Sequence, residues 1–182
     1  MATKTLLTIE EFLRLPQPPD SSYELVEGEL VTVSPGMLPH NIVRDNVLVI
    51  FRAFLAARKP GTVVAEQCFH LFENTVRVPD LAFIRSGREL ATDRPIEGAP
   101  DLVIEVVSPT NTPREISQRI SDFFAAGCKR AWILYPEHRE VYIHGLGGVA
   151  RRHGDEVLED AELLPGFSVK VSSLFEGLEA WA

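Results

Sequence analysis

The sequence is poor in cysteine and has no long apolar run. Its two cysteines, Cys68 and Cys128, lie far apart and form neither a CxxC pair nor a metal-ligand spacing. This excludes a disulfide framework and favours a reduced compartment, with packing roles for both thiols. No apolar stretch approaches the ~20 residues that span a bilayer, and the first residues lack the basic-then-apolar order of a secretory signal. We therefore expect a cytoplasmic protein.

Positive charge is also scarce. Lys and Arg number 18 against 26 Asp and Glu, which leaves a formal charge of −8. Generic binding to nucleic acid needs concentrated Lys and Arg, so the sequence disfavours it. Basic residues do gather after two apolar strands, where they form either a local basic surface or an ordinary solvated face: Arg85, Arg88, Arg114, Arg119, Lys129 and Arg130.

No period of about 20 to 50 residues repeats along the sequence, and no low-complexity segment appears. With 45% hydrophobic and 24% charged residues, the composition is that of an ordinary globular protein. A chain of 182 residues is large enough for one sizeable core. We expect residues 1–182 to form a single domain.

The hydrophobic periodicity predicts helices before and after a mixed sheet. Capping boxes at Thr8 and Glu11 and at Thr112 and Glu115 predict two helix starts. Apolar residues at helical spacing over 39–58 predict a long helix between them. The remaining elements are strands, in the order αββαβββαββ, with a hairpin turn at Glu27–Gly28 and long strands at 62–72, 75–84 and 102–107. The fold class is therefore α/β or α+β.

Two of these apolar strands carry a carboxylate where a core strand should carry none. Glu105 interrupts the run "LVIEVV", and Asp80 follows "TVRVP". Burying an unpaired carboxylate costs several kcal/mol, so each acid must be protonated, paired or bound to a cation. Neighbouring strands lie about 4.8 Å apart, close enough for two acids to share a divalent ion. The other interpretation is a pair of polar groups with ordinary hydrogen-bond partners.

Asp101 shares a strand face with Glu105 and is a tempting third ligand. Four residues at ~3.3 Å each separate the two backbones by about 13 Å, too far for one small ion. We interpret Asp101 as a turn or strand-entry residue after Pro100.

The order of these motifs resembles the Uma-two family of restriction-endonuclease-like proteins, within the PD-(D/E)XK nuclease superfamily. The resemblance covers nearly the whole chain and rests on the combined order and spacing of motifs that are individually unspecific. They are "TIEEFLRLP", "YELVEGEL", His40 at the head of the long helix, "VPDLAFI", "GAPDLVIEVVSPT", "FFAAG", "AWILYP" and "LLPGFSVKVSSLF".

The resemblance implies a restriction-endonuclease-like mixed β-sheet flanked by helices, with an N-terminal helix and β-hairpin. It also implies a metal-dependent endonuclease that hydrolyses DNA phosphodiesters, with Mg²⁺ or Mn²⁺ held by Asp80 and Glu105. DNA is the expected partner ahead of RNA, and a homodimer is expected because nucleases that cut both strands commonly work in pairs. Loss of cleavage, leaving a nucleic-acid-binding or assembly module, is the main alternative, and a purely structural oligomer is a third.

Three further site residues follow from the resemblance. Glu24, in "YELVEGEL", matches an acidic residue of the family hairpin, although it could also be a solvated carboxylate. His40 matches a site histidine, although a buried hydrogen-bonding role is equally open. The superfamily lysine two residues after the second acid is here Val107, and its place passes to Arg119 on the next helix. Arginine keeps the charge but cannot act as a general base near neutral pH. The alternative for Arg119 is a surface arginine paired with Asp122 or Glu115.

Overall fold

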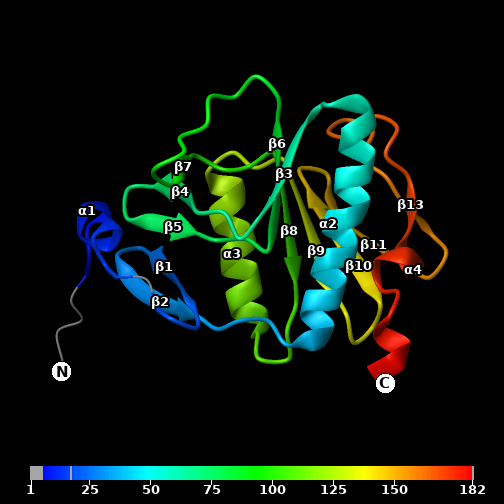
Figure 1. Ribbon diagram of the computed structural model, residues 1–182, viewed down its shortest axis with the longest axis horizontal. Helices are drawn as coiled ribbons and strands as arrows, with labels where there is room; N and C mark the ends of the chain where they lie inside the picture. Colours follow the sequence, from blue (N-terminus) through cyan, green and yellow to red (C-terminus); the bar gives the residue numbers. More distant parts are fainter. Residues whose placement is uncertain (1–5, 17, 182) are drawn as a thin grey trace.

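The computed structural model describes residues 6–16 and 18–181, and its two main sheets lie on either side of helix α3 (Pro113–Ala125; Figure 1). The larger sheet of this described part has six strands. β8 and β9 run parallel and the other neighbours run antiparallel, so the sheet is mixed, as predicted. In spatial order its strands are β11 (Gly148–His153), β10 (Glu140–Gly145), β9 (Arg130–Tyr135), β8 (Leu102–Val106), β6 (Leu81–Arg85) and β3 (Gly61–Ala65).

The smaller sheet contains the predicted N-terminal hairpin. Glu27 and Gly28 both have positive φ, 51° and 84°, which suits the tight turn between β1 and β2. Helix α1 (Ile9–Leu13) precedes the hairpin, and its capping box between Thr8 and Glu11 is confirmed. The five strands of this sheet in the described chain are, in order, β2 (Glu29–Val33), β1 (Ser22–Val26), β5 (Thr75–Arg77), β4 (Phe69–Phe72) and β7 (Ile96–Glu97).

Helix α2 (Leu38–Arg58) covers one face of the six-stranded sheet with apolar side chains. The predicted helical stripe is confirmed, since Val43, Val47 and Phe51 are all at most 1% exposed. Phe51 packs edge-on against Trp132 of β9, with ring centroids 5.6 Å apart. Each fully buried side chain of this size contributes about 1.5–3 kcal/mol. The C-terminal elements complete this side of the core: β12 (Val157–Leu158), β13 (Val169–Lys170), α4 (Val171–Leu174) and the 3₁₀ helix Leu178–Trp181.

Helix α3 covers the opposite face of the same sheet. Its capping box between Thr112 and Glu115 is confirmed, and Gly127, at φ 99°, follows its C-terminal end. Phe123 is fully buried, and Ile116 packs against the same cluster. Unlike α2, α3 also places charged side chains among its inward-facing residues, and these reach the smaller sheet.

The prediction of long strands at 62–72 and 75–84 is wrong. Glu66 adopts a left-handed φ of 52° and turns the chain, so the first segment becomes β3 and β4 in different sheets. Pro79 has no amide hydrogen for a ladder, and the second segment divides into β5 and β6. Asp80 consequently lies in a bend just before β6, where the chain passes from the smaller sheet to the larger one.

None of the helices in the described ranges combines the length and hydropathy needed to cross a membrane.

Candidate active site

The structure brings Asp80 and Glu105 together across two neighbouring strands. β6 and β8 pair antiparallel with Leu81 opposite Ile104, and continuing this register by one residue places Asp80 opposite Glu105. The side chain of Asp80 also contacts the backbone next to Glu105, because the Val106 N–H donates to Asp80 Oδ2 at 2.7 Å. Opposite residues of an antiparallel pair project from the same face of the sheet. That face is the one covered by α3, since Val103 and Val107 both pack in the cluster around Phe123.

His40 holds the other side of Asp80. It lies in the first turn of α2 and is 8% exposed, and its Nε2 is 3.1 Å from Asp80 Oδ2. Its Nδ1 faces Asn41 Oδ1 at 3.3 Å, while the Asn41 amide donates to the Gly36 carbonyl. Both ring nitrogens therefore face acceptors, an arrangement that an imidazolium satisfies because it donates from both. Burial alone would lower the pKa of His40, but the bond to Asp80 and its charge raise it.

Arg119 reaches from α3 to both the sheet and the hairpin. Its Nη2 and Nε donate to Glu105 Oε1 at 2.9 and 3.2 Å, and its Nη1 lies 2.7 Å from each oxygen of Glu24. The alternative pairing with Asp122 or Glu115 is therefore wrong. Burial opposes the charge of Arg119, but the two carboxylates outweigh it and raise the pKa of the guanidinium further. Arg119 is a permanent cation between two acids.

Glu24 lies at the bottom of this arrangement, with a side chain only 1% exposed. Each of its oxygens accepts two hydrogen bonds. Arg119 Nη1 serves both, the Val78 N–H adds a bond of 2.8 Å to Oε1, and Arg77 Nη1 adds one of 2.8 Å to Oε2. Burial would raise the pKa of Glu24, but the guanidinium groups of Arg119 and Arg77 lower it. The interpretation of Glu24 as a solvated hairpin carboxylate is wrong.

Arg77 and Asp122 belong to the same cluster and were missed by the sequence reasoning. Arg77 Nε and Nη2 donate to Asp122 Oδ2 at 2.9 and 2.5 Å, and Gln118 donates to the other oxygen at 2.8 Å. One signal for them was available. Arg77 interrupts an apolar strand, and Asp122 directly precedes the buried Phe123 on α3.

The cluster as a whole carries an excess of negative charge. Four carboxylates (Glu24, Asp80, Glu105 and Asp122) share two guanidinium groups (Arg77 and Arg119), which leaves a formal charge of −2 before His40 is counted. This excess of negative charge affects the protonation of Glu105. Burial and the charges of Asp80 and Glu24 outweigh Arg119 and raise the pKa of Glu105 to about 8.

Two oxygen atoms remain available for a cation. In the described chain, Asp80 Oδ1 and Glu105 Oε2 accept no hydrogen bond. Among the described side chains, the only polar atom that is both fully buried and without a hydrogen-bond partner is Trp132 Nε1. Both oxygens therefore reach solvent. Hard oxygen donors in this number fit Mg²⁺, which binds one or two carboxylates and keeps several waters. Within residues 6–16 and 18–181, no three His, Cys, Asp or Glu side chains form a metal-binding group.

Asp101 is not part of the site. It lies in the bend before β8, and its Oδ2 accepts a hydrogen bond of 2.9 Å from the Arg85 N–H. This agrees with its interpretation as a strand-entry residue.

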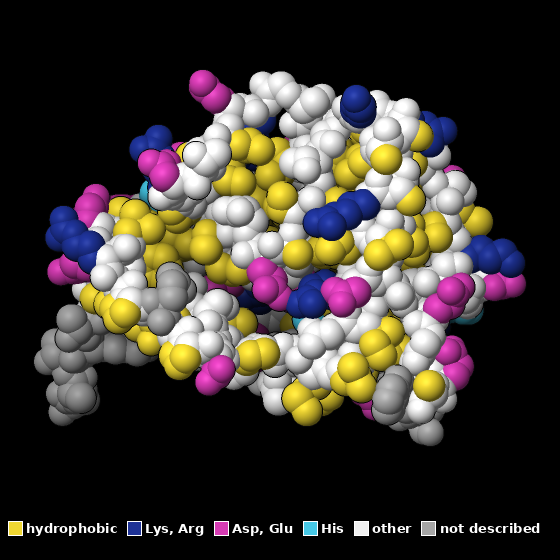
Figure 2. Space-filling view, in the orientation of Figure 1, with side chains coloured by type: hydrophobic (Ala, Val, Ile, Leu, Met, Phe, Trp, Pro, Cys, Tyr) yellow, Lys and Arg dark blue, Asp and Glu magenta, His cyan; other side chains and the backbone are white. Residues whose placement is uncertain are grey.

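On the face shown in Figure 2, the basic residues do not gather into one patch. Lys and Arg are scattered over the face in Figure 2, and blue and magenta side chains lie next to one another near its centre. Arg130 is paired with Asp160 at 2.7 Å, and Arg85 Nε lies 3.8 Å from Asp101.

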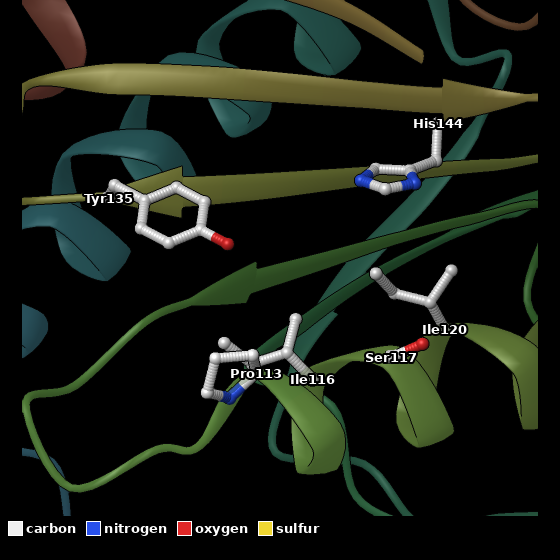
Figure 3. Close-up of a pocket in the computed structure, with 6 residues that line it drawn as sticks. All are labelled: Pro113, Ile116, Ser117, Ile120, Tyr135 and His144. Atoms are coloured by element: carbon white, nitrogen blue, oxygen red, sulfur yellow. The ribbon is translucent and has the colours of Figure 1, made fainter. Parts of the chain in front are cut away.

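A pocket lies on another flank of α3 (Figure 3). It is an open pocket of about 240 Å³ between the helix and strands β9 and β10. Tyr135 and His144 project from the strands toward Ile116, Ser117 and Ile120 of the helix. Burial lowers the pKa of His144. None of the charged residues of the cluster lines this pocket, so it is separate from the site.

Comparison with known proteins points in one direction. The sequence matches, over residues 9–172, a family model with the description "Uma2: Putative restriction endonuclease". No curated protein matches the chain. A crystal structure of "a putative nuclease belonging to DUF820" from Anabaena variabilis superposes with a TM-score of 0.81 and 18% identity. The superposition covers 93% of this chain and 97% of that one, and it shows a shared fold.

Proposed function

Because the chain belongs to the Uma2 family, whose description is "Putative restriction endonuclease", we propose that it is a metal-dependent endonuclease that hydrolyses DNA phosphodiester bonds. One observation carries the proposal. Asp80 and Glu105 stand opposite each other at the open side of a cluster in which carboxylates outnumber guanidinium groups, and each presents a free oxygen. A divalent cation neutralises that excess.

Each residue of the site has a distinct role in this proposal. Asp80 and Glu105 would hold Mg²⁺ or Mn²⁺, which when bound lowers the pKa of an attacking water and stabilises charge developing on the phosphate. His40 donates to Asp80 Oδ2 and thereby leaves Oδ1 turned toward solvent. Arg119 supplies a fixed positive charge at the rim, where its side chain is 17% exposed. Glu24 holds Arg119 and has no oxygen left for a cation.

No lysine stands beside Glu105, since the position two residues on is Val107. Arg119 keeps its proton at any pH at which the protein is folded, so it does not abstract one from water. Its contribution is electrostatic, as a fixed positive charge, because its N–H groups are already donated to Glu24, Glu105 and the Val78 carbonyl.

A second candidate function has its own supporting observation. Arg119 occupies Oε1 of Glu105, so one ligand oxygen is already bound to a cation of the chain itself. A site closed in this way would suit a nucleic-acid-binding or assembly module that has lost cleavage. The two functions differ in whether the wild-type chain nicks DNA.

The test combines cation binding and cleavage. Wild type, Glu105→Gln and Glu137→Gln, an exposed carboxylate on the β9–β10 turn, are titrated with Mn²⁺ by calorimetry and incubated with supercoiled plasmid. We expect binding and nicking by wild type and Glu137→Gln. Glu105→Gln should nick roughly 100- to 1,000-fold more slowly, because metal assistance contributes several kcal/mol. Wild type that binds no Mn²⁺ would remove the proposal.

A further variant separates the two candidates. Arg119→Lys restores the residue type expected in the superfamily site. If wild type is silent and Arg119→Lys nicks plasmid in Mn²⁺, the second candidate function holds. If wild type already nicks, it fails.

The partners follow from the same proposal. We expect DNA to be preferred over RNA and the chain to act as a homodimer, because cutting both strands needs two centres. Cleavage of matched DNA and RNA duplexes tests the first expectation, and sedimentation velocity tests the second.

A further inference from the structure

We propose that Arg77 is a positioning residue of the candidate site: held by Asp122 of α3, it fixes Glu24, and Glu24 fixes Arg119 against Glu105. The inference deepens the proposed function and rests on it for its activity readout. Its structural readout stands without any assumption about activity.

Opposite charges alternate along the four residues that link α3 to the smaller sheet. Asp122, Arg77, Glu24 and Arg119 form a chain of acid, base, acid and base, with contacts of 2.5, 2.8 and 2.7 Å. Two of the four residues, Arg119 and Asp122, lie three apart on one flank of α3. The other two lie on β1 and β5 of the smaller sheet. Each sheet residue thus meets a helix residue of opposite charge.

The backbone directly after Arg77 also contacts the Glu24–Arg119 pair. The next residue, Val78, donates its N–H to Glu24 Oε1 and accepts Arg119 Nη2 at its carbonyl at 3.0 Å. The chain at 77–78 therefore contacts both members of the Glu24–Arg119 pair. Shifting this segment would displace the carboxylate and the guanidinium together.

The charged side chains of this network are buried, and burying charge is costly. The side chains of Arg77, Glu24 and Asp122 are 6%, 1% and 7% exposed. Apolar residues of similar volume in place of such a buried pair are often equally stable or more stable. Stability alone therefore gives little reason for the Arg77–Asp122 pair. Holding Arg119 in a defined position against Glu105 gives a reason for the pair.

The test uses a double variant that removes both charges at once, Arg77→Met with Asp122→Asn. The net charge of the cluster is unchanged, and asparagine keeps an acceptor for Gln118. The matched control is Arg130→Met with Asp160→Asn, which removes another ion pair, of 2.7 Å, outside the cluster. Urea denaturation first establishes that each variant folds.

The structural readout is the Nε–H resonance of Arg119 in ¹⁵N NMR, assigned by its absence in Arg119→Lys. In the Arg77 double variant we expect this resonance to shift and to exchange with water at least tenfold faster. The control pair should leave it in place. An unchanged Arg119 resonance in the folded Arg77 double variant would overturn the proposal, whether or not the protein cleaves DNA.

The kinetic readout distinguishes positioning from substrate binding. Loss of partners that orient a site commonly lowers activity about 10- to 100-fold. We expect kcat in saturating Mn²⁺ to fall within that range in the Arg77 double variant, with KM for plasmid unchanged. A wild type without activity contradicts the proposed function, and the NMR result then decides the positioning role by itself. An active double variant with wild-type kcat contradicts the positioning role alone.

Discussion

The charged cluster has two halves that differ in burial and in charge balance. The inner half is Glu24, Arg77 and Asp122, and the outer half is Asp80 and Glu105, with Arg119 joining the two. The inner side chains are at most 7% exposed and the outer ones 13% and 20%. Together with Arg119, the inner half balances two acids with two bases, whereas the outer half adds two acids and no guanidinium of its own.

The difference shows how charge balance separates structure from chemistry. A carboxylate whose lone pairs are all taken by donors, as in Glu24, is fixed and has nothing left to bind. A carboxylate such as Glu105, which accepts hydrogen bonds on one oxygen only and lies near other acids, has a raised pKa and keeps one oxygen unbonded, where we propose that a cation binds. We therefore expect variants of the two halves to behave differently.

The largest contrast is expected in stability. Glu24→Gln leaves two buried guanidinium groups short of a carboxylate, and breaking a buried pair costs about 3–5 kcal/mol. Glu105→Gln removes part of the charge excess, so its free energy of unfolding should equal or exceed that of wild type. Urea denaturation measures both. Glu27→Gln, in the exposed hairpin turn, is the matched control. Equal destabilisation by the Glu24 and Glu105 variants would contradict the view that the two halves contribute differently to stability.

The next contrast concerns the support of Asp80. A Cβ on Gly36 would lie 2.2 Å from His40 Nδ1, so Gly36→Ala must displace the ring from its present place beside Asp80. Overpacking of this kind costs typically about 1–3 kcal/mol. His40→Ala makes room for the methyl group, and the double variant should recover part of that loss. Thermal unfolding of the four proteins gives the coupling energy. Simple additivity would mean that His40 does not fill this space.

A smaller effect is expected from cation binding to the outer half. At ten times its Kd, a ligand that binds only the folded state stabilises it by about 1.4 kcal/mol. Mn²⁺ should therefore raise the Tm of wild type and of Glu27→Gln in a saturable way, and leave Glu105→Gln unaffected. A Tm increase that persists in Glu105→Gln would place the cation elsewhere.

The smallest effect is expected in the pKa of Cys68, a thiol whose pKa depends on the charge of Glu24 in the inner half. Burial raises the pKa of this thiol, and the negative charge of Glu24 raises it further. In a Cys128→Ala background, Glu24→Gln should therefore lower the pKa of Cys68, and alkylation by iodoacetamide should become faster at a pH below that pKa. Glu137→Gln should not change it. A Cys68 pKa that is insensitive to Glu24→Gln would indicate that Glu24 carries no charge in the folded protein.

Much of the fold was open to prediction because it depends on local signals. The apolar stripe of Val43, Val47 and Phe51 predicts α2, and two capping boxes predict the starts of α1 and α3. The strands at 62–72 and 75–84 were misjudged because their residues suit a sheet throughout, and only pairing with different partners divides them. The interpretation of residues 1–182 as one domain stays a prediction, since residues 1–5, 17 and 182 lie outside the described residues.

The candidate site was predictable to a lesser extent. Asp80 and Glu105 are conspicuous in the sequence because a charge in an apolar run is costly and needs a reason. Glu24, His40 and Arg119 came from the family resemblance, and the structure brings all five into one cluster. Their catalytic and metal-binding roles stay predictions. Arg77 also interrupts an apolar run, but its pairing with Asp122 could not be predicted, because the two residues lie 45 positions apart in the chain.

By itself, the amino-acid sequence determined where the helices begin, which faces are apolar and which two acids lack a reason to be buried. These properties depend on side chains a few positions apart. Only the tertiary structure decided that both oxygens of Glu24 are fully hydrogen-bonded whereas Glu105 keeps one oxygen without a hydrogen bond, although Arg119 contacts both residues. The state of a carboxylate depends on how many donors and charges surround it, and those arrive from strands and helices that are distant in the chain.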